Sequence, residues 1–189
     1  MLIEITWAGP YAWPSFKAKN NLPPIPEISG VYLQTFEYQN GYLIYCAGLT
    51  NRPVPVRFSE HTDEYFKGNY TVFDMAAMRQ GIRKEVWHGW GYARKHRSEF
   101  EERKPLILNA VQKQLTEFRI FVGHLGKEPR LLERLEASVM NNLYQKPSPF
   151  CDIPDRGMHL TPRYDSEPPI TVKNKCDVIL HGLPPQMEI

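Results

Sequence analysis

The chain has 189 residues, of which 42% are hydrophobic and 23% charged, as is typical of a folded globular protein. Its formal net charge of +2 excludes a globally basic nucleic-acid-binding protein, so contact with nucleic acid would need a local cluster of basic side chains. Three widely spaced cysteines, with no secretory segment and no long apolar run, predict a cytoplasmic protein with no disulfide and no membrane partner.

Prolines gather near both ends of the chain, first between residues 10 and 26 and again between residues 147 and 185. Proline cannot continue a helix and cannot donate a hydrogen bond to a β-ladder. Residues 1–6 alternate as a short strand does. Apart from that strand, we expect irregular extensions at residues 1–27 and 147–189, packed on a domain at residues 28–146.

The first elements of this domain are predicted to be a β-hairpin and a helix. Residues 30–37 and 42–47 are rich in β-branched and aromatic residues, and the Gln39-Asn40-Gly41 sequence between them is typical of a tight turn. A helix is predicted at residues 54–66, because its apolar positions recur with helical spacing and its two prolines fall in or before the first turn.

The rest of the domain is predicted to hold a short helix, a third strand and two long helices. The short helix covers residues 73–80 and the strand residues 82–88. A helical stretch with a kink or break at Pro105 follows at residues 94–122, and a last helix covers residues 128–145. These elements predict an α+β fold in which a small three-stranded antiparallel sheet is flanked by helices.

Arg57 and His61 lie one turn apart on the helix predicted at residues 54–66. His61 belongs to the inward-facing stripe and Arg57 lies on its edge, so the two side chains are neighbours. A guanidinium and an imidazole together suit the binding or attack of a phosphate diester. The alternative is structural, with His61 bonded to a backbone carbonyl in the core and Arg57 extending its charge into water.

Glu136 lies within the apolar stripe of the last predicted helix. The other members of this stripe are Leu132, Leu135, Val139 and Leu143. A carboxylate that faces a core without a partner carries a large desolvation penalty, so it must be paired, protonated or bound to a cation. Two interpretations are therefore open, a metal ligand or a salt bridge with Arg57 or Arg134.

Tyr32 faces away from the aliphatic side of its strand, because it alternates with Gln34 and Phe36 and not with Val31 and Leu33. Its phenol is therefore on a mixed face that can border a cleft. The alternative for a strand tyrosine is simple packing in the core.

Four short motifs, in order along the chain, resemble the signatures of the GIY-YIG nuclease domain. Gly30-Val31-Tyr32 resembles the first signature, and Tyr45-Cys46-Ala47-Gly48 resembles the second. Arg57 and His61 resemble its R-x-x-x-H helix, and residues 135–140 resemble the segment around its metal-binding glutamate. The resemblance covers most of the chain.

This resemblance implies a magnesium-dependent DNA endonuclease. Glu136 would hold one Mg²⁺ or Mn²⁺ ion, and Tyr32 would accept a proton from the attacking water with His61 as a relay. Arg57 would stabilise charge on the phosphate, and Tyr45 would position a phosphate oxygen or the nucleophile. The implied partner is the phosphate backbone of DNA, and cutting both strands with one site per chain would favour a homodimer.

The sequence departs from the family pattern at two places. The second signature is one residue too long, so counting back from Gly48 places Cys46 where a tyrosine is expected, and a β-bulge would be needed to restore Tyr45. The asparagine expected about a dozen residues after the glutamate is replaced by Pro147 and Ser148. A second hypothesis is therefore a catalytically impaired module of the same fold that binds nucleic acid or a protein partner.

Overall fold

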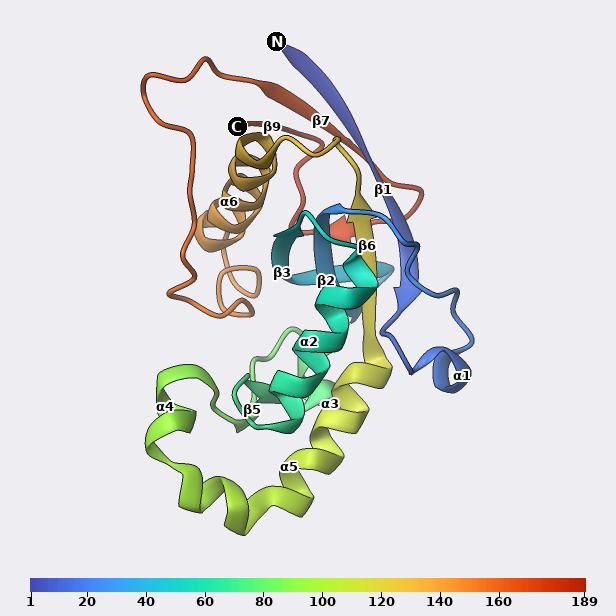
Figure 1. The fold of residues 1–189 in the computed structure, drawn as a ribbon, viewed down its shortest axis with the longest axis vertical. Coiled ribbons are helices and arrows are strands. Elements are labelled where there is room, and N and C mark those ends of the chain that lie inside the picture. Colours follow the sequence, from blue (N-terminus) through green and yellow to red (C-terminus); the bar gives the residue numbers. More distant parts are fainter.

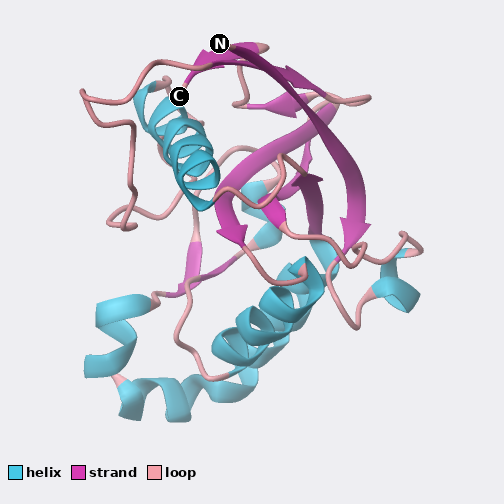
Figure 2. Ribbon diagram, turned by 45° about the horizontal axis from the view of Figure 1, so that its top comes forward, coloured by secondary structure: helices cyan, strands magenta, loops and turns pink.

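The computed structural model describes the whole chain from Met1 to Ile189, and a curled mixed sheet forms its centre (Figure 1 and Figure 2). The strands of this sheet are β1 (Leu2–Ala12), β2 (Gly30–Tyr38), β3 (Gly41–Thr50), β6 (Phe118–Gly123), β7 (Thr171–Lys175), β8 (Leu180–His181) and β9 (Gln186–Glu188). Their order across the sheet is β8-β3-β2-β6-β1-β7-β9. The β1–β7 and β3–β8 pairs are parallel and the other pairs are antiparallel.

Helices cover both faces of the sheet. The helices are α1 (Lys17–Asn20), α2 (Val54–Phe66), α3 (Met75–Met78), α4 (Trp90–Lys95), α5 (Arg97–Glu117) and α6 (Pro129–Gln145). The helices α2 and α5 pack on one face with the two-stranded sheet of β4 (Val72–Phe73) and β5 (Glu85–Trp87), whereas α6 packs on the opposite face. Each face therefore has its own apolar core.

The sequence-based prediction of a small three-stranded antiparallel sheet is wrong, because the sheet has seven strands. The strand expected at residues 82–88 is reduced to β5, which pairs with β4 and not with the main sheet. The strand that does pair with β2 is β6, which falls at the end of the predicted helical stretch 94–122. Both faces of β6 are buried, so its apolar residues show no alternation that would distinguish a strand from a buried helix. The fold is nevertheless α+β.

The irregular extensions expected at the two ends of the chain are also wrong in large part. Residues 1–27 contribute the long strand β1, and residues 147–189 contribute β7, β8 and β9. Pro10 is accommodated inside β1 because the register with β6 shifts between Ala8 and Tyr11. Each end of the chain thus completes the central sheet.

Several other elements match the sequence predictions. The hairpin of β2 and β3 is confirmed, and so are the helices expected at residues 54–66 and 128–145. The helix expected at residues 73–80 shortens to α3, which Asp74 caps by accepting hydrogen bonds from two backbone amides. The stretch 94–122 divides into parts of α4, α5 and β6, with Pro105 inside α5.

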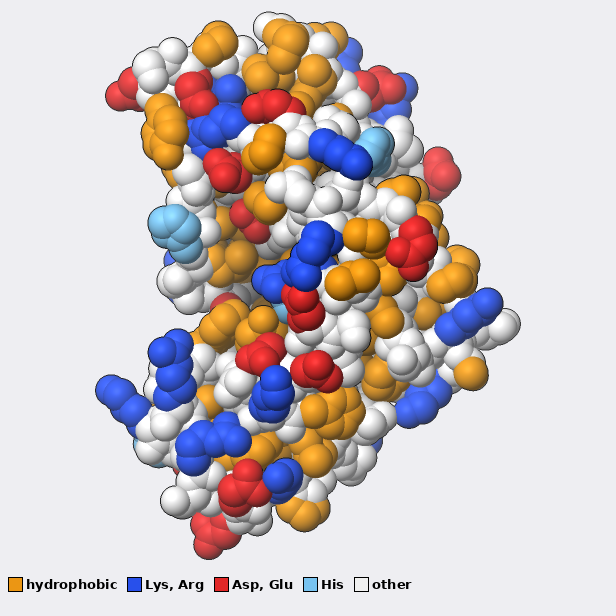
Figure 3. Space-filling model, viewed as in Figure 1, with side chains coloured by type: hydrophobic (Ala, Val, Ile, Leu, Met, Phe, Trp, Pro, Cys, Tyr) orange, Lys and Arg blue, Asp and Glu red, His pale blue; other side chains and the backbone are white.

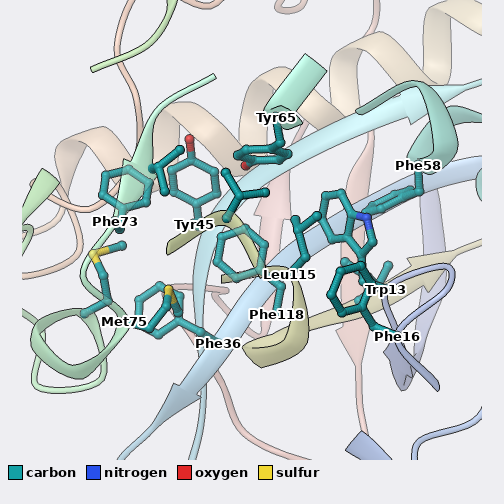
Figure 4. Close-up of a cluster of buried hydrophobic side chains, with 14 of the residues drawn as sticks. Trp13, Phe16, Phe36, Tyr45, Phe58, Tyr65, Phe73, Met75, Leu115 and Phe118 are labelled. Atoms are coloured by element: carbon teal, nitrogen blue, oxygen red, sulfur yellow. The ribbon is translucent and has the colours of Figure 1, made fainter. Parts of the chain in front are cut away.

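Aromatic side chains dominate the core between the sheet and helices α2 and α5. Figure 4 shows Tyr45 of β3 in this cluster with Tyr65 of α2 and Phe118 of β6. The ring of Tyr45 stacks on Phe118 with centroids 5.7 Å apart and meets Phe73 edge-on at 5.4 Å. Such pairs stabilise beyond the burial of their area. The aromatic cluster therefore fixes the strand that carries Tyr45.

Two features of the chain agree with its composition. All three cysteines are free thiols, as their spacing predicts. No helix combines the length and the apolar character that crossing a bilayer requires.

Candidate active site

A pocket of about 220 Å³ lies beside the edge of β3. Strand β8 pairs with β3 only at Tyr42 and Leu43, so no strand covers the rest of this edge. Helix α2 reaches the pocket from one face of the sheet and α6 from the other. All five side chains predicted as site residues line this pocket: Tyr32, Tyr45, Arg57, His61 and Glu136.

A chain of hydrogen bonds connects Tyr32, His61 and Tyr70. The Tyr32 hydroxyl lies 2.9 Å from Nε2 of His61, and Nδ1 of His61 lies 3.1 Å from the Tyr70 hydroxyl. Burial, together with the smaller effect of the nearby charge of Arg57, lowers the pKa of His61 to about 4, so the imidazole is neutral at pH 7. A neutral imidazole has one donor and one acceptor nitrogen, so the two tyrosines play opposite roles towards it. His61 is thus bonded to two tyrosine hydroxyls and not to the backbone carbonyl that the structural alternative expected.

The Tyr32 phenol is almost fully buried, and Gly48 makes room for it. A Cβ at Gly48 would lie 2.4 Å from the ring and hydroxyl of Tyr32, so only glycine fits opposite the phenol. Burial raises the pKa of Tyr32 above its usual value, while the positive charge of Arg57 acts in the opposite direction. Tyr32 is therefore a protonated phenol that needs neighbouring cations to ionise.

A β-bulge places Tyr45 in the pocket. Gln34 pairs with Cys46 and Thr35 with Ile44, which leaves Tyr45 as the extra residue of β3. The bulge lets Tyr45 and Cys46 face the same side of the sheet, and both line the pocket. The extra residue in the second signature is thus absorbed by the backbone.

Asp155, from the segment after α6, holds the hydroxyl of Tyr45. The Tyr45 O–H donates to Oδ2 of Asp155 at 2.8 Å, and Arg83 forms an ion pair with Oδ1 of the same carboxylate. The Tyr144 hydroxyl donates to the backbone carbonyl of Asp155 at 2.8 Å. These contacts bring the C-terminal segment to the wall of the pocket.

Arg57 is the main positive charge of the pocket. Its guanidinium forms an ion pair with Glu60 at 3.1 Å, and Glu60 also binds Arg52 through two hydrogen bonds of 2.7 and 2.9 Å. Two arginines therefore share one carboxylate, which leaves positive charge unbalanced. The side chain of Arg57 is 38% exposed, so a phosphate could approach it.

Glu136 is a half-buried carboxyl group that forms no ion pair. The salt bridges considered from the sequence are not formed, because Arg57 pairs with Glu60 and Arg134 donates to the carbonyls of Pro168 and Ile189. Burial raises the pKa of Glu136 to about 7, although the Leu49 amide favours the ionised form. A carboxylate at this position is stabilised by any cation that enters the pocket.

The lining residues that the sequence does not predict as part of the site include Gln34, Tyr70, Trp90 and Asp155. The Oε1 atom of Gln34 is buried and has no hydrogen-bond partner. Trp90 has a positive φ of 59°, a conformation that no sequence pattern reveals. Asp155 comes from an irregular segment, so neither helical nor strand periodicity gives its direction. Tyr70 likewise lies in an irregular segment, Asn69-Tyr70-Thr71, between α2 and β4.

The oxygen donors of the pocket fit a hydrated Mg²⁺ ion and not a metal held by protein ligands alone. No group of three His, Cys, Asp or Glu side chains is placed to hold a metal. Of the two lining carboxylates, Asp155 already accepts hydrogen bonds from Arg83, Tyr45 and Trp90, which leaves Glu136 as the one available. Mg²⁺ keeps several waters and binds through one or two carboxylates and substrate phosphate, so a single carboxylate suffices.

No protein-family model matches this chain, and neither the curated proteins nor the solved structures include a match.

Proposed function

We propose that this protein is a magnesium-dependent endonuclease of the GIY-YIG type that hydrolyses phosphodiester bonds in DNA. The observation that carries the proposal is the unpaired carboxyl of Glu136 in the same pocket as Arg57 and the bonded pair of Tyr32 and His61. A tyrosine, a histidine, an arginine and an available carboxylate are the groups that attack on a phosphate diester needs.

Tyr32 and His61 would remove the proton of the attacking water. In the tautomer that allows this, Tyr32 donates its hydroxyl proton to Nε2 of His61, and Nδ1–H donates to Tyr70. Tyr32 takes a proton from water as its own proton moves to His61. The water oxygen bonds to phosphorus as the bond from phosphorus to the sugar oxygen breaks, and the sugar oxygen takes a proton from solvent as it leaves. His61 then releases its added proton to solvent. Tyr70 holds the imidazole in the required tautomer.

Arg57 would stabilise the charge that develops on the phosphate. Its guanidinium also lowers the pKa of Tyr32, which favours the phenolate during proton transfer. Tyr45 would position a phosphate oxygen once its hydroxyl leaves Asp155. Glu136 would hold the divalent ion, which when bound offsets negative charge on the scissile phosphate.

Cleavage of supercoiled plasmid DNA tests this function. Wild type should nick or linearise the plasmid with MgCl2 or MnCl2 and not with EDTA, and Glu136→Gln should lower the rate about a hundredfold or more. Glu133→Gln is the matched control, because Glu133 lies on the same helix and pairs with Arg130 outside the pocket. The proposal fails if wild type cleaves no duplex, branched or single-stranded DNA, or if Glu136→Gln cleaves as fast as wild type.

One observation favours a second candidate, a nucleic-acid-binding module of this type without turnover. The Tyr45 hydroxyl is bound to Asp155, which itself is fixed by Arg83, so the second phenol is not free. Tight binding of DNA by a wild-type protein that cleaves none of the substrates would support this candidate. Faster cleavage by Asp155→Asn would argue for a nuclease that Asp155 restrains.

A further inference from the structure

A second cavity, of about 710 Å³, opens beside the candidate active site. The two cavities share Trp90, Asp155 and Met158 in their walls. The larger one lies between α4 and the segment after α6, where the surface is hollowed on one side of the molecule (Figure 3). Its volume is in the range of about 300–1,000 Å³ that is typical of ligand sites.

Trp90 stands at the junction of these cavities in a strained backbone conformation. Its φ of 59° is rare for a bulky residue and costs energy that the surroundings must offset. The backbone N–H donates to the carbonyl of Asn69 at 2.7 Å, and the indole N–H donates to Asp155 at 2.7 Å. The indole also packs against Tyr70, with centroids 4.8 Å apart. Three contacts, one each with Asn69, Asp155 and Tyr70, therefore hold Trp90 in place.

The indole is held in this position without being buried. Trp90 is 44% exposed, whereas the other three tryptophans are at most 2% exposed. Strain that keeps an aromatic ring at a cavity mouth is typical of a binding position. A flat π-surface of this kind is the platform on which unpaired nucleobases stack.

Cationic side chains line the same cavity. Arg94 and Arg156 form no ion pair with any carboxylate, and Arg156 packs over Tyr144 with a distance of 5.2 Å to the ring centroid. The lining holds three arginines and two carboxylates. Asp155 pairs with Arg83, which also pairs with Glu85, and Asp152 is exposed. The positive charge of two unpaired guanidinium groups favours an anionic ligand.

We propose that this cavity binds an unpaired nucleotide of a polynucleotide, with its base stacked on Trp90 and its phosphate held by Arg94 and Arg156. The inference rests on the proposed nuclease function, because the nucleotide would adjoin the phosphate in the smaller pocket. A base inside a duplex has no free face, so stacking on Trp90 requires a single strand, a gap or a flap. The preferred substrate is thus DNA with unpaired nucleotides next to the cleavage point.

Tryptophan fluorescence tests this binding without any cleavage. We expect a 12-nucleotide oligothymidylate in EDTA to quench the emission of the full chain and to shield it from acrylamide, because Trp90 is the one exposed tryptophan. A duplex of equal length and thymidine 5′-monophosphate are the comparison ligands. Equal quenching by the monophosphate at the same nucleotide concentration would point to a free-nucleotide site and overturn the proposal, as would equal quenching by the duplex.

Two variants identify the contacts. Trp90→Gly suits the positive φ and should weaken binding of oligothymidylate, measured by anisotropy of a labelled strand, about tenfold. Arg94→Gln should weaken it several-fold and reduce its salt dependence, whereas Lys95→Gln, the adjacent exposed residue outside the cavity, should change it less than twofold. Unchanged binding by a folded Trp90→Gly protein, or equal effects of the Arg94 and Lys95 variants, would overturn the proposal.

The outcomes separate this inference from the proposed nuclease function. Binding that depends on Trp90 and Arg94 without cleavage of any substrate would support the nucleotide site and contradict the nuclease. Magnesium-dependent cleavage that is equally fast on intact duplex and gapped DNA, in wild type and in Trp90→Gly, would support the nuclease and contradict the nucleotide site.

Discussion

The close approach of Gly48 and Tyr32 makes the phenol's position depend on a single missing methyl group. A Cβ at residue 48 would overlap the Tyr32 ring, which is also fixed by Phe58 at a centroid distance of 4.8 Å and by His61. Because Phe58 and His61 already contact the ring, a methyl group added at residue 48 would displace it from this position. Gly48, which belongs to the second signature on the adjacent strand β3, thus sets the position of Tyr32, the candidate general base.

Gly48→Ala should therefore destabilise the protein and separate Tyr32 from His61. We expect a loss of about 1–3 kcal/mol in the free energy of unfolding, measured by urea denaturation, and a large loss of any cleavage activity. Gly91→Ala is the control, because no atom lies within 4 Å of the added Cβ and the residue is inside α4. That variant should be neutral or up to about 1 kcal/mol more stable. Similar effects of the two substitutions would contradict this account of Gly48.

The pKa of Glu136 makes the stability of the metal-free protein depend on pH. The carboxyl titrates at about 7 when folded and near 4.5 when unfolded, so the folded state favours the protonated form. This contribution is complete below about pH 4.5 and is lost as the pH rises through 7. In EDTA, the wild type should lose about 1–3 kcal/mol more stability than Glu136→Gln between pH 5 and pH 8.

Thermal unfolding of both proteins at several pH values measures this difference. The pKa of His61 is lowered by burial, which reduces stability as the pH falls from about 6.5 towards 4, but this effect is common to both proteins and cancels. If Mg²⁺ binds the ionised carboxylate, MgCl2 should restore stability to the wild type at pH 8 and not to Glu136→Gln. Parallel pH curves for the two proteins would show that Glu136 is not the group responsible.

At the scale of elements, the sequence predicts those parts of the fold whose signals are local. Helices α2 and α6 have prolines in their first turns and clear apolar stripes, and the hairpin has its Asn-Gly turn. These elements carry all five predicted site residues, which explains why the pocket could be predicted although the sheet could not. The pairing of β1 with β6 and β7 joins residues more than a hundred positions apart, and no local pattern encodes it.

Irregular segments account for the parts of the site that the sequence does not predict. Trp90 follows a glycine and takes its direction from a positive φ, and Asp155 is positioned by Arg83 and Tyr144. The sequence predicts the bulge at Tyr45 only as one of two outcomes, because whether an extra residue is absorbed depends on pairing with β2. When tertiary contacts set the direction of a side chain, that direction can be determined only from the folded structure.

Helix α5 contains a proline that its own geometry does not require. Pro105 is exposed, lies in the helix interior and lacks the N–H that would bond the carbonyl of Glu101. Pro105→Ala should raise the free energy of unfolding by about 1–3 kcal/mol in urea denaturation. Leu106→Ala, at the adjacent exposed position, should change it by less than about 0.5 kcal/mol. A less stable Pro105→Ala protein would mean that the proline is needed to place α4 beside the larger cavity.

At the scale of the whole molecule, the candidate site and the chain ends belong to one continuous sheet. The pocket lies beside β3 near one edge, while β9 forms the other edge, and β1 connects the two halves by pairing with β6 and β7. The last residue is bound on both sides, because Ile189 exchanges two backbone hydrogen bonds with Ile170 and its carbonyl accepts from Arg134. Local unfolding of β9 would therefore also disrupt the core between the sheet and α6.

Met187→Ala tests whether residues 147–189 unfold with the rest of the chain. Met187 is buried in the core that α6 covers, so its truncation should cost about 2–5 kcal/mol, whereas Glu188→Ala at the next, exposed position should cost less than about 0.5 kcal/mol. Because β1 ties both halves together, circular dichroism and tryptophan fluorescence should report one coincident transition at a lower urea concentration. Two separate transitions, with the fluorescence of the aromatic core unchanged in the first, would instead mean that these residues fold as an arm on an independent domain at residues 28–146.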